Sequence, residues 1–303
     1  MGDLNEVPLG KRIMALLVSE HGIGKSGLAA SFCREGPLHF FDFDGRMDGV
    51  KRLYPHVKKG LITYETYGPM TEGRFKSCIQ FMKDLEALAK NCPYSTIVLD
   101  SLASMTNTSV VFQMISRGAA SVSQLPLEMA DPKNKDKGTK DKITKGGIPV
   151  PSWDEFNGEA MFMCEVFDIC KILPCNVILT SWPVTRTKIE GATSSVKESL
   201  VTFGVKTPGM VPGYFNEIWR VITEAKGMEQ NSEIARYVIT QPYGDYIAKT
   251  SLPIPGKIEI PQIEKFGCAC CRPDGYFYGI FQELKKKGLE KLLALPPQSP
   301  LTV

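Results

Sequence analysis

The feature that most constrains the fold is a phosphate-loop pattern near the start of the chain, at residues 19–26 (Ser-Glu-His-Gly-Ile-Gly-Lys-Ser). The general pattern is Gly, four residues, and then Gly-Lys-Ser or Gly-Lys-Thr. This chain departs from it only at the first position, which is Ser19. A short apolar run at 12–19 precedes the pattern, and 27–34 is typical of a helix. The order strand, loop, helix is the one that phosphate binding requires, although a glycine-rich turn could also simply connect a strand to a helix.

Each residue type in the loop has a physical role. Glycines let backbone N–H groups curl around a β-phosphate, the Lys25 ammonium can reach the β- and γ-phosphates, and the Ser26 hydroxyl can ligate Mg²⁺. We therefore predict that ATP and Mg²⁺ are the cofactors. The predicted nucleotide-binding residues are Gly22, Ile23, Gly24, Lys25, Ser26 and Gly27.

Polar residues end three further apolar runs. Asp44 closes the run at 38–44, and Asp100 closes the run at 95–100. An aspartate at the carboxyl end of a parallel strand lies beside the phosphate loop, so we expect Asp100 to hold Mg²⁺ through water. The alternative for Asp100 is a surface cap. Asp44 could orient or deprotonate the attacking water, which makes Lys25, Asp44 and Asp100 the predicted catalytic set.

The third run, at 176–181, ends in Thr180 and Ser181, which could sense the γ-phosphate. Apolar β-runs alternate with helical patterns along this part of the chain, as in a doubly wound parallel sheet. One of those helices is expected to start at Thr71 as N-cap. Antiparallel strands are predicted at 217–223 and 234–240, and a helix at 277–293.

Two stretches break this alternation and are predicted to be mobile loops, at 119–150 and 182–213. Unconstrained cations would attract nucleic-acid phosphates, although charged insertions are often only solvated surface. The predicted DNA-binding candidates in the two loops are Lys133, Lys135, Lys137, Lys140, Lys142, Lys145, Arg186 and Lys188.

The order of these parts resembles the RecA-like P-loop ATPases over roughly residues 10–240, and most closely the phage-encoded AAA-group nucleotide-binding proteins of single-strand annealing and recombination. The fold class implied is α/β, a mainly parallel sheet flanked by helices, with antiparallel strands and a C-terminal helix added. The resemblance also implies ATP hydrolysis, single-stranded DNA as partner, and a homo-oligomeric ring or filament. It leaves open whether a single-strand-binding protein takes part.

The chain departs from this family at two points. Asp44 stands where the family has a catalytic glutamate, so its reach to the attacking water is shorter. Thr180 or Ser181 stands where a glutamine often couples the γ-phosphate to the DNA loop. Such ATPases usually complete the site with a cation from the neighbouring subunit, for which Arg186, Lys188 and Arg220 are the candidates.

Two other functions compete with a DNA-dependent ATPase. The departures at Asp44 and Ser181 favour a nucleotide-gated DNA- or protein-binding module with negligible hydrolysis. Another P-loop enzyme, such as a kinase or GTPase, is the third hypothesis. Against a GTPase, Asn134-Lys135-Asp136 has the wrong spacing for a base-reading motif, and against a kinase no arginine lies between Ile143 and Arg186 to form a lid.

The composition bounds the remaining choices. The net charge of +3 is too small to indicate nucleic-acid binding by itself, and no apolar run approaches the roughly 20 residues of a membrane span. We expect a cytoplasmic protein with no membrane partner, in which the cysteines that stand singly in apolar patterns (Cys33, Cys78, Cys164 and Cys170) are reduced. The expected domains are 1–265, which binds nucleotide, and 266–303. The second contains Cys268, Cys270 and Cys271, too few ligands for an ordinary structural zinc site, although a partial site shared between subunits stays open.

Overall fold

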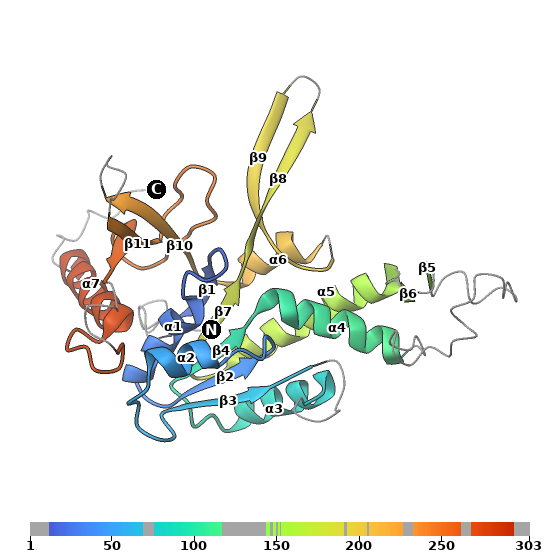
Figure 1. Ribbon diagram of the computed structural model, residues 1–303, viewed down its shortest axis with the longest axis horizontal. Coiled ribbons are helices and arrows are strands. Elements are labelled where there is room, and N and C mark those ends of the chain that lie inside the picture. The colour runs from blue at the N-terminus through green and yellow to red at the C-terminus, as the bar shows by residue number, and fades with distance from the viewer. Residues whose placement is uncertain are drawn as a thin grey trace, which may run out of the picture.

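A mainly parallel sheet of eight strands forms the centre of the molecule (Figure 1). The computed structural model describes residues 12–68, 76–116, 144–145, 148–149, 151, 153–190, 193–204, 206–226, 233–261 and 268–293. The sheet order is β12-β11-β10-β1-β7-β4-β2-β3. These strands are β1 (Met14–Val18), β2 (Leu38–Asp42), β3 (Ile62–Thr66), β4 (Thr96–Asp100), β7 (Asn176–Ser181), β10 (Glu217–Lys226), β11 (Glu233–Ile239) and β12 (Lys257–Ile260).

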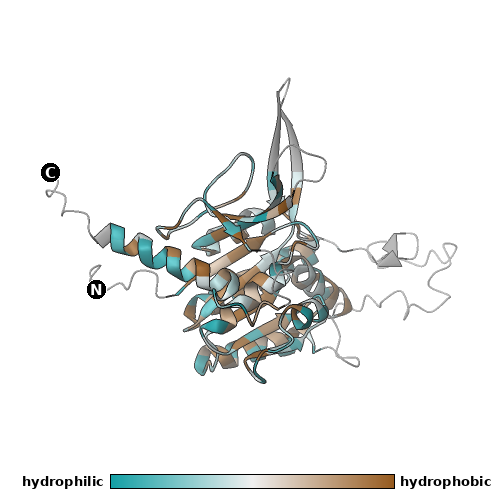
Figure 2. Cartoon of the chain, turned by 60° about the vertical axis from the view of Figure 1, so that its left-hand side comes forward, coloured by the Kyte–Doolittle hydropathy of each residue, from teal (hydrophilic) through white to brown (hydrophobic). Residues whose placement is uncertain are grey.

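The central strands are buried at every residue, because helices cover both faces of the sheet. Along β1, Ala15 and Leu17 face one hydrophobic cluster while Leu16 and Val18 face the other. Figure 2 shows the resulting hydrophobic colouring on the central strands. The pairing places β7 between β1 and β4, so the phosphate-loop strand and the Asp100 strand are separated by the strand that carries Thr180.

Two helical layers complete the fold. One face is covered by α1 (Lys25–Ala30), the 3-10 helix η2 (Ser31–Arg34), α2 (Asp48–Leu53) and α7 (Tyr276–Leu293). The other is covered by α3 (Cys78–Lys90), α4 (Leu102–Ser116), α5 (Trp153–Ile172) and α6 (Thr207–Tyr214). The predicted fold class is confirmed, including the added antiparallel strands and the C-terminal helix. None of the described helices is long and apolar enough to cross a membrane.

The prediction of a loop at 182–213 is wrong. This segment forms a two-stranded antiparallel hairpin, β8 (Pro183–Glu190) and β9 (Thr193–Leu200), followed by α6. The hairpin stands out from the body of the molecule (Figure 1). Within 119–150 the structure describes only two short strands, β5 (Thr144–Lys145) and β6 (Ile148–Pro149).

The predicted start of the third helix is also wrong. α3 begins at Cys78, and the Ser77 side chain caps it by accepting a hydrogen bond from the Gln80 backbone N–H at 3.2 Å. The segment that was expected to supply the cap, with Thr71, lies outside the described residues. Ser77 satisfies one of the N–H groups that a helix start leaves without a helical partner.

A buried acid lies where α5 packs against the start of α6. Glu159 is fully buried, and neither carboxylate oxygen has a hydrogen-bond partner among the described residues. The Thr207 hydroxyl lies nearby, and a methyl group built on Gly204 would come within 2.9 Å of the carboxylate. Burial raises the pKa of Glu159 to about 7 because the charged form loses its hydration.

We predict that Glu159→Gln flattens part of the pH dependence of stability. Since burial raises the folded-state pKa above the unfolded one, ionisation of Glu159 destabilises the native state as pH rises from about 4.5 to 7. Glutamine cannot ionise, so the variant should gain up to roughly 3 kcal/mol relative to wild type between pH 5 and pH 8. Urea unfolding of both proteins at the two pH values measures this difference. An unchanged difference would contradict the assignment.

Candidate functional site

The phosphate loop is built on two glycines that adopt backbone angles unfavourable for other residues. Gly22 has φ of 76° and Gly24 has φ of 96°, and Gly24 is also the N-cap of α1. A left-handed backbone is strained for residues with a Cβ. Gly27 is needed for another reason, since a methyl group there would lie 2.4 Å from Leu53 of α2. The loop is thus shaped by glycine at its apex and by helix packing at its end.

A buried carboxylate joins the ends of three segments. Asp100, at the end of β4, accepts one hydrogen bond from the Ser26 hydroxyl at 2.6 Å and a short one from the Thr180 hydroxyl. Ser26 belongs to the phosphate-loop helix and Thr180 to β7. Burial raises the pKa of Asp100, while these two donors and the Lys25 ammonium oppose the rise. The structure therefore brings together three of the predicted site residues.

Lys25 lies over its own loop. Its ammonium donates to the Ser19 carbonyl at 2.9 Å, the Ser19 hydroxyl at 3.2 Å and the Glu20 carbonyl at 3.1 Å. Burial lowers the pKa of Lys25 to about 8, and the negative charges of Asp100, Asp44 and Glu20 oppose this change. A cation destabilised by burial is poised to bind an anion, since new negative charge restores its preference for the protonated form.

The two acids at the end of β2, Asp42 and Asp44, have different roles. Asp42 is buried and accepts hydrogen bonds from the backbone N–H groups of Asp44 at 3.0 Å and Gly45 at 2.8 Å, so it fixes the turn. Burial raises the pKa of Asp42 to about 6. Asp44 is half-buried and accepts a hydrogen bond from the Ser101 hydroxyl at 2.8 Å. Ser101 follows Asp100 directly, so Asp44 lies at the same edge as the phosphate loop.

Arg220 is a residue of this site whose surroundings sequence reasoning missed. It lies beside Val18 on β10, with 5% of its side chain exposed, and its guanidinium contacts Glu198 at 2.8 Å and Glu20 at 3.3 Å. Its burial and its pairing within its own chain disfavour Arg220 as the cation that a neighbouring subunit would use. It instead joins the phosphate loop to the base of the β8–β9 hairpin.

Three more contacts connect the loop to distant parts of the chain. The Arg236 guanidinium, on β11, donates to the Ile23 carbonyl at 3.4 Å. The His21 ring lies 4.0 Å from the Trp182 ring, measured between centroids, and Trp182 directly precedes β8. Ser181 adds a backbone contact, since its carbonyl accepts from the Ser19 N–H at 3.2 Å. These pairs could not be predicted from the sequence, because their members lie more than 150 residues apart in the chain.

The predicted DNA-binding cations are not placed by the structure. Lys133, Lys135, Lys137, Lys140 and Lys142 lie outside the described residues. The backbone of Lys145 belongs to β5, and the backbones of Arg186 and Lys188 belong to β8, but the side chains of all three lie outside the description. Their role in binding stays a prediction.

Comparison with known proteins gives one kind of match. No protein-family model matches the sequence, and no curated protein matches it. Among solved structures, the chain is similar to a KaiC-like protein from the hyperthermophilic archaeon Pyrococcus horikoshii OT3, with 15% identity and a TM-score of 0.40. The match covers 82% of this chain and 90% of that one. At this identity and TM-score the match carries no argument about the site.

Proposed function

We propose that this chain binds ATP together with Mg²⁺ at the phosphate loop and hydrolyses the ATP. The observation that carries the proposal is the Ser26–Asp100–Thr180 hydrogen-bonded group beside the buried Lys25 ammonium. A hydroxyl and a carboxylate at one point are hard oxygen ligands of the kind that Mg²⁺ prefers. The Lys25 ammonium donates its hydrogen bonds only to neutral oxygens of Ser19 and Glu20, so it can exchange them for the oxygens of a triphosphate.

The residues divide the chemistry among them. Ser26 and Asp100 would hold Mg²⁺, which when bound neutralises charge on the phosphate oxygens. The loop backbone from Gly22 to Gly27 would bind the phosphates, and Lys25 would stabilise the charge that develops on the γ-phosphate. Asp44, held by Ser101, would orient the attacking water and accept its proton. Thr180 lies on β7 and shares Asp100 with Ser26, so its hydrogen bond to Asp100 would change when Mg²⁺ binds.

We predict that Lys25 takes up a proton when ATP binds. With a pKa of about 8, roughly half of Lys25 is neutral at pH 8, and the triphosphate raises that pKa. Wild type should therefore take up about half a proton at pH 8, and its affinity should fall as pH rises above 8. Titration calorimetry in buffers of different ionisation enthalpy measures the uptake.

Two variants separate the charge of Lys25 from its proton. Lys25→Arg keeps a charge that does not titrate, so the proton uptake should disappear. Lys25→Ala should weaken ATP binding by about 10- to 100-fold, since it removes a charge-assisted contact. Unchanged binding in Lys25→Ala would contradict the proposed site, provided that its unfolding transition matches that of wild type.

We predict next that Asp44→Asn slows phosphate release from ATP by at least about 100-fold while ATP affinity changes less than threefold, because a general base contributes roughly that much. Ser101→Ala, which only removes the hydrogen bond to Asp44, should slow it less. Steady-state phosphate release measures both. If wild type released phosphate no faster than Asp44→Asn, the alternative of a nucleotide-gated binding module with negligible hydrolysis would be favoured.

The proposed partner is single-stranded DNA, with the β8–β9 hairpin as the responsive element. The contacts at its base favour this second part of the proposal: Trp182 against His21, and Glu198 against Arg220. Both contacts connect the base of the hairpin to the phosphate loop, Trp182 through His21 and Glu198 through Arg220 and Glu20. A change in the loop on ATP binding would therefore move the base of the hairpin. The cations Arg186 and Lys188 in β8 remain candidates for contact with DNA or with a neighbouring copy in a ring or filament.

We predict that His21→Ala uncouples nucleotide from DNA. In wild type, a non-hydrolysable ATP analogue should tighten binding of a single-stranded oligonucleotide by about tenfold, the usual size of such coupling. His21→Ala should lose most of this gain while its nucleotide affinity stays within a few-fold, because His21 is exposed and contacts Trp182 through its ring. Fluorescence anisotropy measures both. Equal, weak DNA binding in every nucleotide state would exclude the DNA role and leave the nucleotide site intact.

A further inference from the structure

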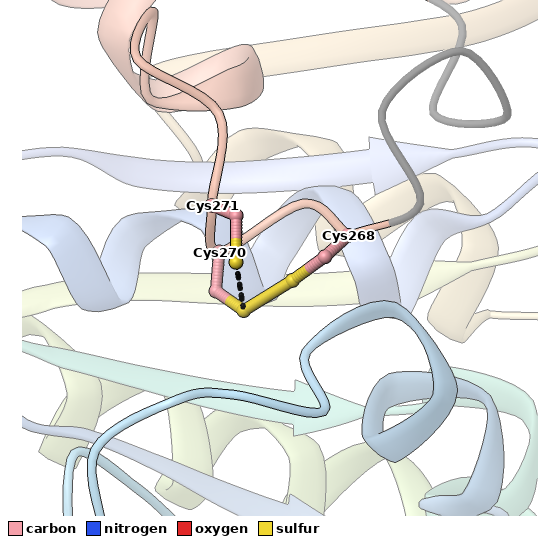
Figure 3. Close-up of side chains that lie close together, drawn as sticks. All are labelled: Cys268, Cys270 and Cys271. Carbon is pink, nitrogen blue, oxygen red and sulfur yellow. Dashed lines mark hydrogen bonds between the residues drawn. A yellow bond between two sulfur atoms is a disulfide. The ribbon is translucent and has the colours of Figure 1, made fainter.

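Three cysteine sulfur atoms lie together on a turn that the nucleotide site does not use. The Sγ atoms of Cys268, Cys270 and Cys271 all lie within 4.8 Å of one another (Figure 3). A disulfide joins Cys268 to Cys270, and the Cys271 sulfur lies 3.9 Å from that of Cys270. Cys268 is buried and Cys271 is exposed, so the group opens to solvent on one side.

The disulfide contributes little to holding the fold together. Its cysteines are separated by two positions, and a cross-link that closes so short a loop removes little conformational entropy from the unfolded chain. Other contacts fix the turn. The Ala269 N–H donates to the Leu53 carbonyl at 2.8 Å, and the Arg34 guanidinium donates to the carbonyls of Cys270 at 2.8 Å and Arg272 at 2.7 Å. The three sulfurs would therefore stay together without the disulfide.

We propose that the reduced turn is a binding site for one soft cation, Zn²⁺ or Cu⁺, held by the thiolates of Cys268, Cys270 and Cys271. Sulfur ligands select these ions over Mg²⁺ and Ca²⁺. The Arg34 guanidinium, bound to the backbone of the turn, offsets part of the negative charge of three thiolates. Three anchored sulfurs with one open side form a site that is organised before the metal arrives.

Formation of the site takes two steps. A phosphine reductant breaks the Cys268–Cys270 bond, giving up two electrons and taking oxygen from water, whose two protons go to the two sulfurs. The metal then replaces the protons of three thiols, forming three sulfur–metal bonds and releasing three protons to solvent. The disulfide and the metal exclude each other because they use the same sulfurs.

The ligand count distinguishes the two ions. Among the described residues, no histidine or carboxylate joins the three cysteines in one group. Cu⁺ can be satisfied by three thiolates, whereas Zn²⁺ takes four ligands and would add a water on the open side. The exposed position of Cys271 leaves room for that water.

The test is a metal titration of the full chain, reduced with a phosphine and desalted without oxygen. Zn²⁺ is offered in competition with a chromophoric chelator, and Cu⁺ in competition with bicinchoninate. We expect one equivalent of at least one of the two ions to be withdrawn from its competitor by the reduced protein, and none by the oxidised protein. Withdrawal of Zn²⁺ alone indicates the site with water, and withdrawal of Cu⁺ alone indicates the three-sulfur site.

Cys271→Ser is the decisive variant, since Cys271 is exposed and outside the disulfide. It should weaken metal binding by at least about 100-fold. Loss of a group that only hydrogen-bonds to a metal ligand already lowers the affinity by about 10- to 100-fold, and Cys271 is itself a ligand. Cys92→Ser is the matched control, because it removes a half-buried free thiol from another part of the chain, and it should bind as wild type does.

Two results would overturn the proposal: no stoichiometric uptake by reduced wild type, or uptake that survives in Cys271→Ser. Lys25→Ala should bind the metal with unchanged affinity, because the phosphate loop contributes none of the three ligands. Intact metal uptake by Lys25→Ala would therefore support the cysteine site whether or not this variant binds ATP.

Discussion

One buried carboxylate organises the edge of the sheet on which the rest of the site depends. Asp100 receives the hydroxyls of Ser26 and Thr180, and so ties the phosphate-loop helix and β7 to the end of β4. In a low-dielectric interior an acid with two donors is held far more firmly than a surface acid. Because β7 lies between β1 and β4, the strand order itself places Thr180 within reach of Asp100. The order of the strands therefore determines which side chains meet in the site.

The parts that sequence predicted correctly are those with a strong local signal. The runs that end at Asp100 and Ser181 are apolar at their centres and buried throughout, as expected of parallel strands covered on both faces. The phosphate loop is marked by glycines whose positive φ is a local demand. Arg220 and Arg236 carry no such signal. Their partners Glu20 and Ile23 lie about two hundred residues earlier in the chain, and only the register of β10 and β11 brings them together.

The hairpin at 183–200 was missed for a physical reason. The ribbon forms a separate two-stranded sheet, so its strands lack the continuous apolar run that marks the buried strands of the central sheet. Serine, threonine and charged residues then resemble a loop, although threonine and valine also favour strands. The base of the ribbon has clear partners: Trp182 contacts His21 and Glu198 contacts Arg220, and these contacts link the ribbon to the candidate site.

The charges around the loop explain why metal and triphosphate would have to bind together. Burial and the nearby charge of Asp44 raise the pKa of Asp100, while burial lowers the pKa of Lys25. A triphosphate alone would relieve Lys25 but add to the repulsion around Asp100 and Asp44. A divalent cation alone would relieve the acids but compete with the Lys25 charge. Metal and triphosphate together relieve both Lys25 and the acids and also neutralise each other, so each ligand would bind more tightly when the other is present.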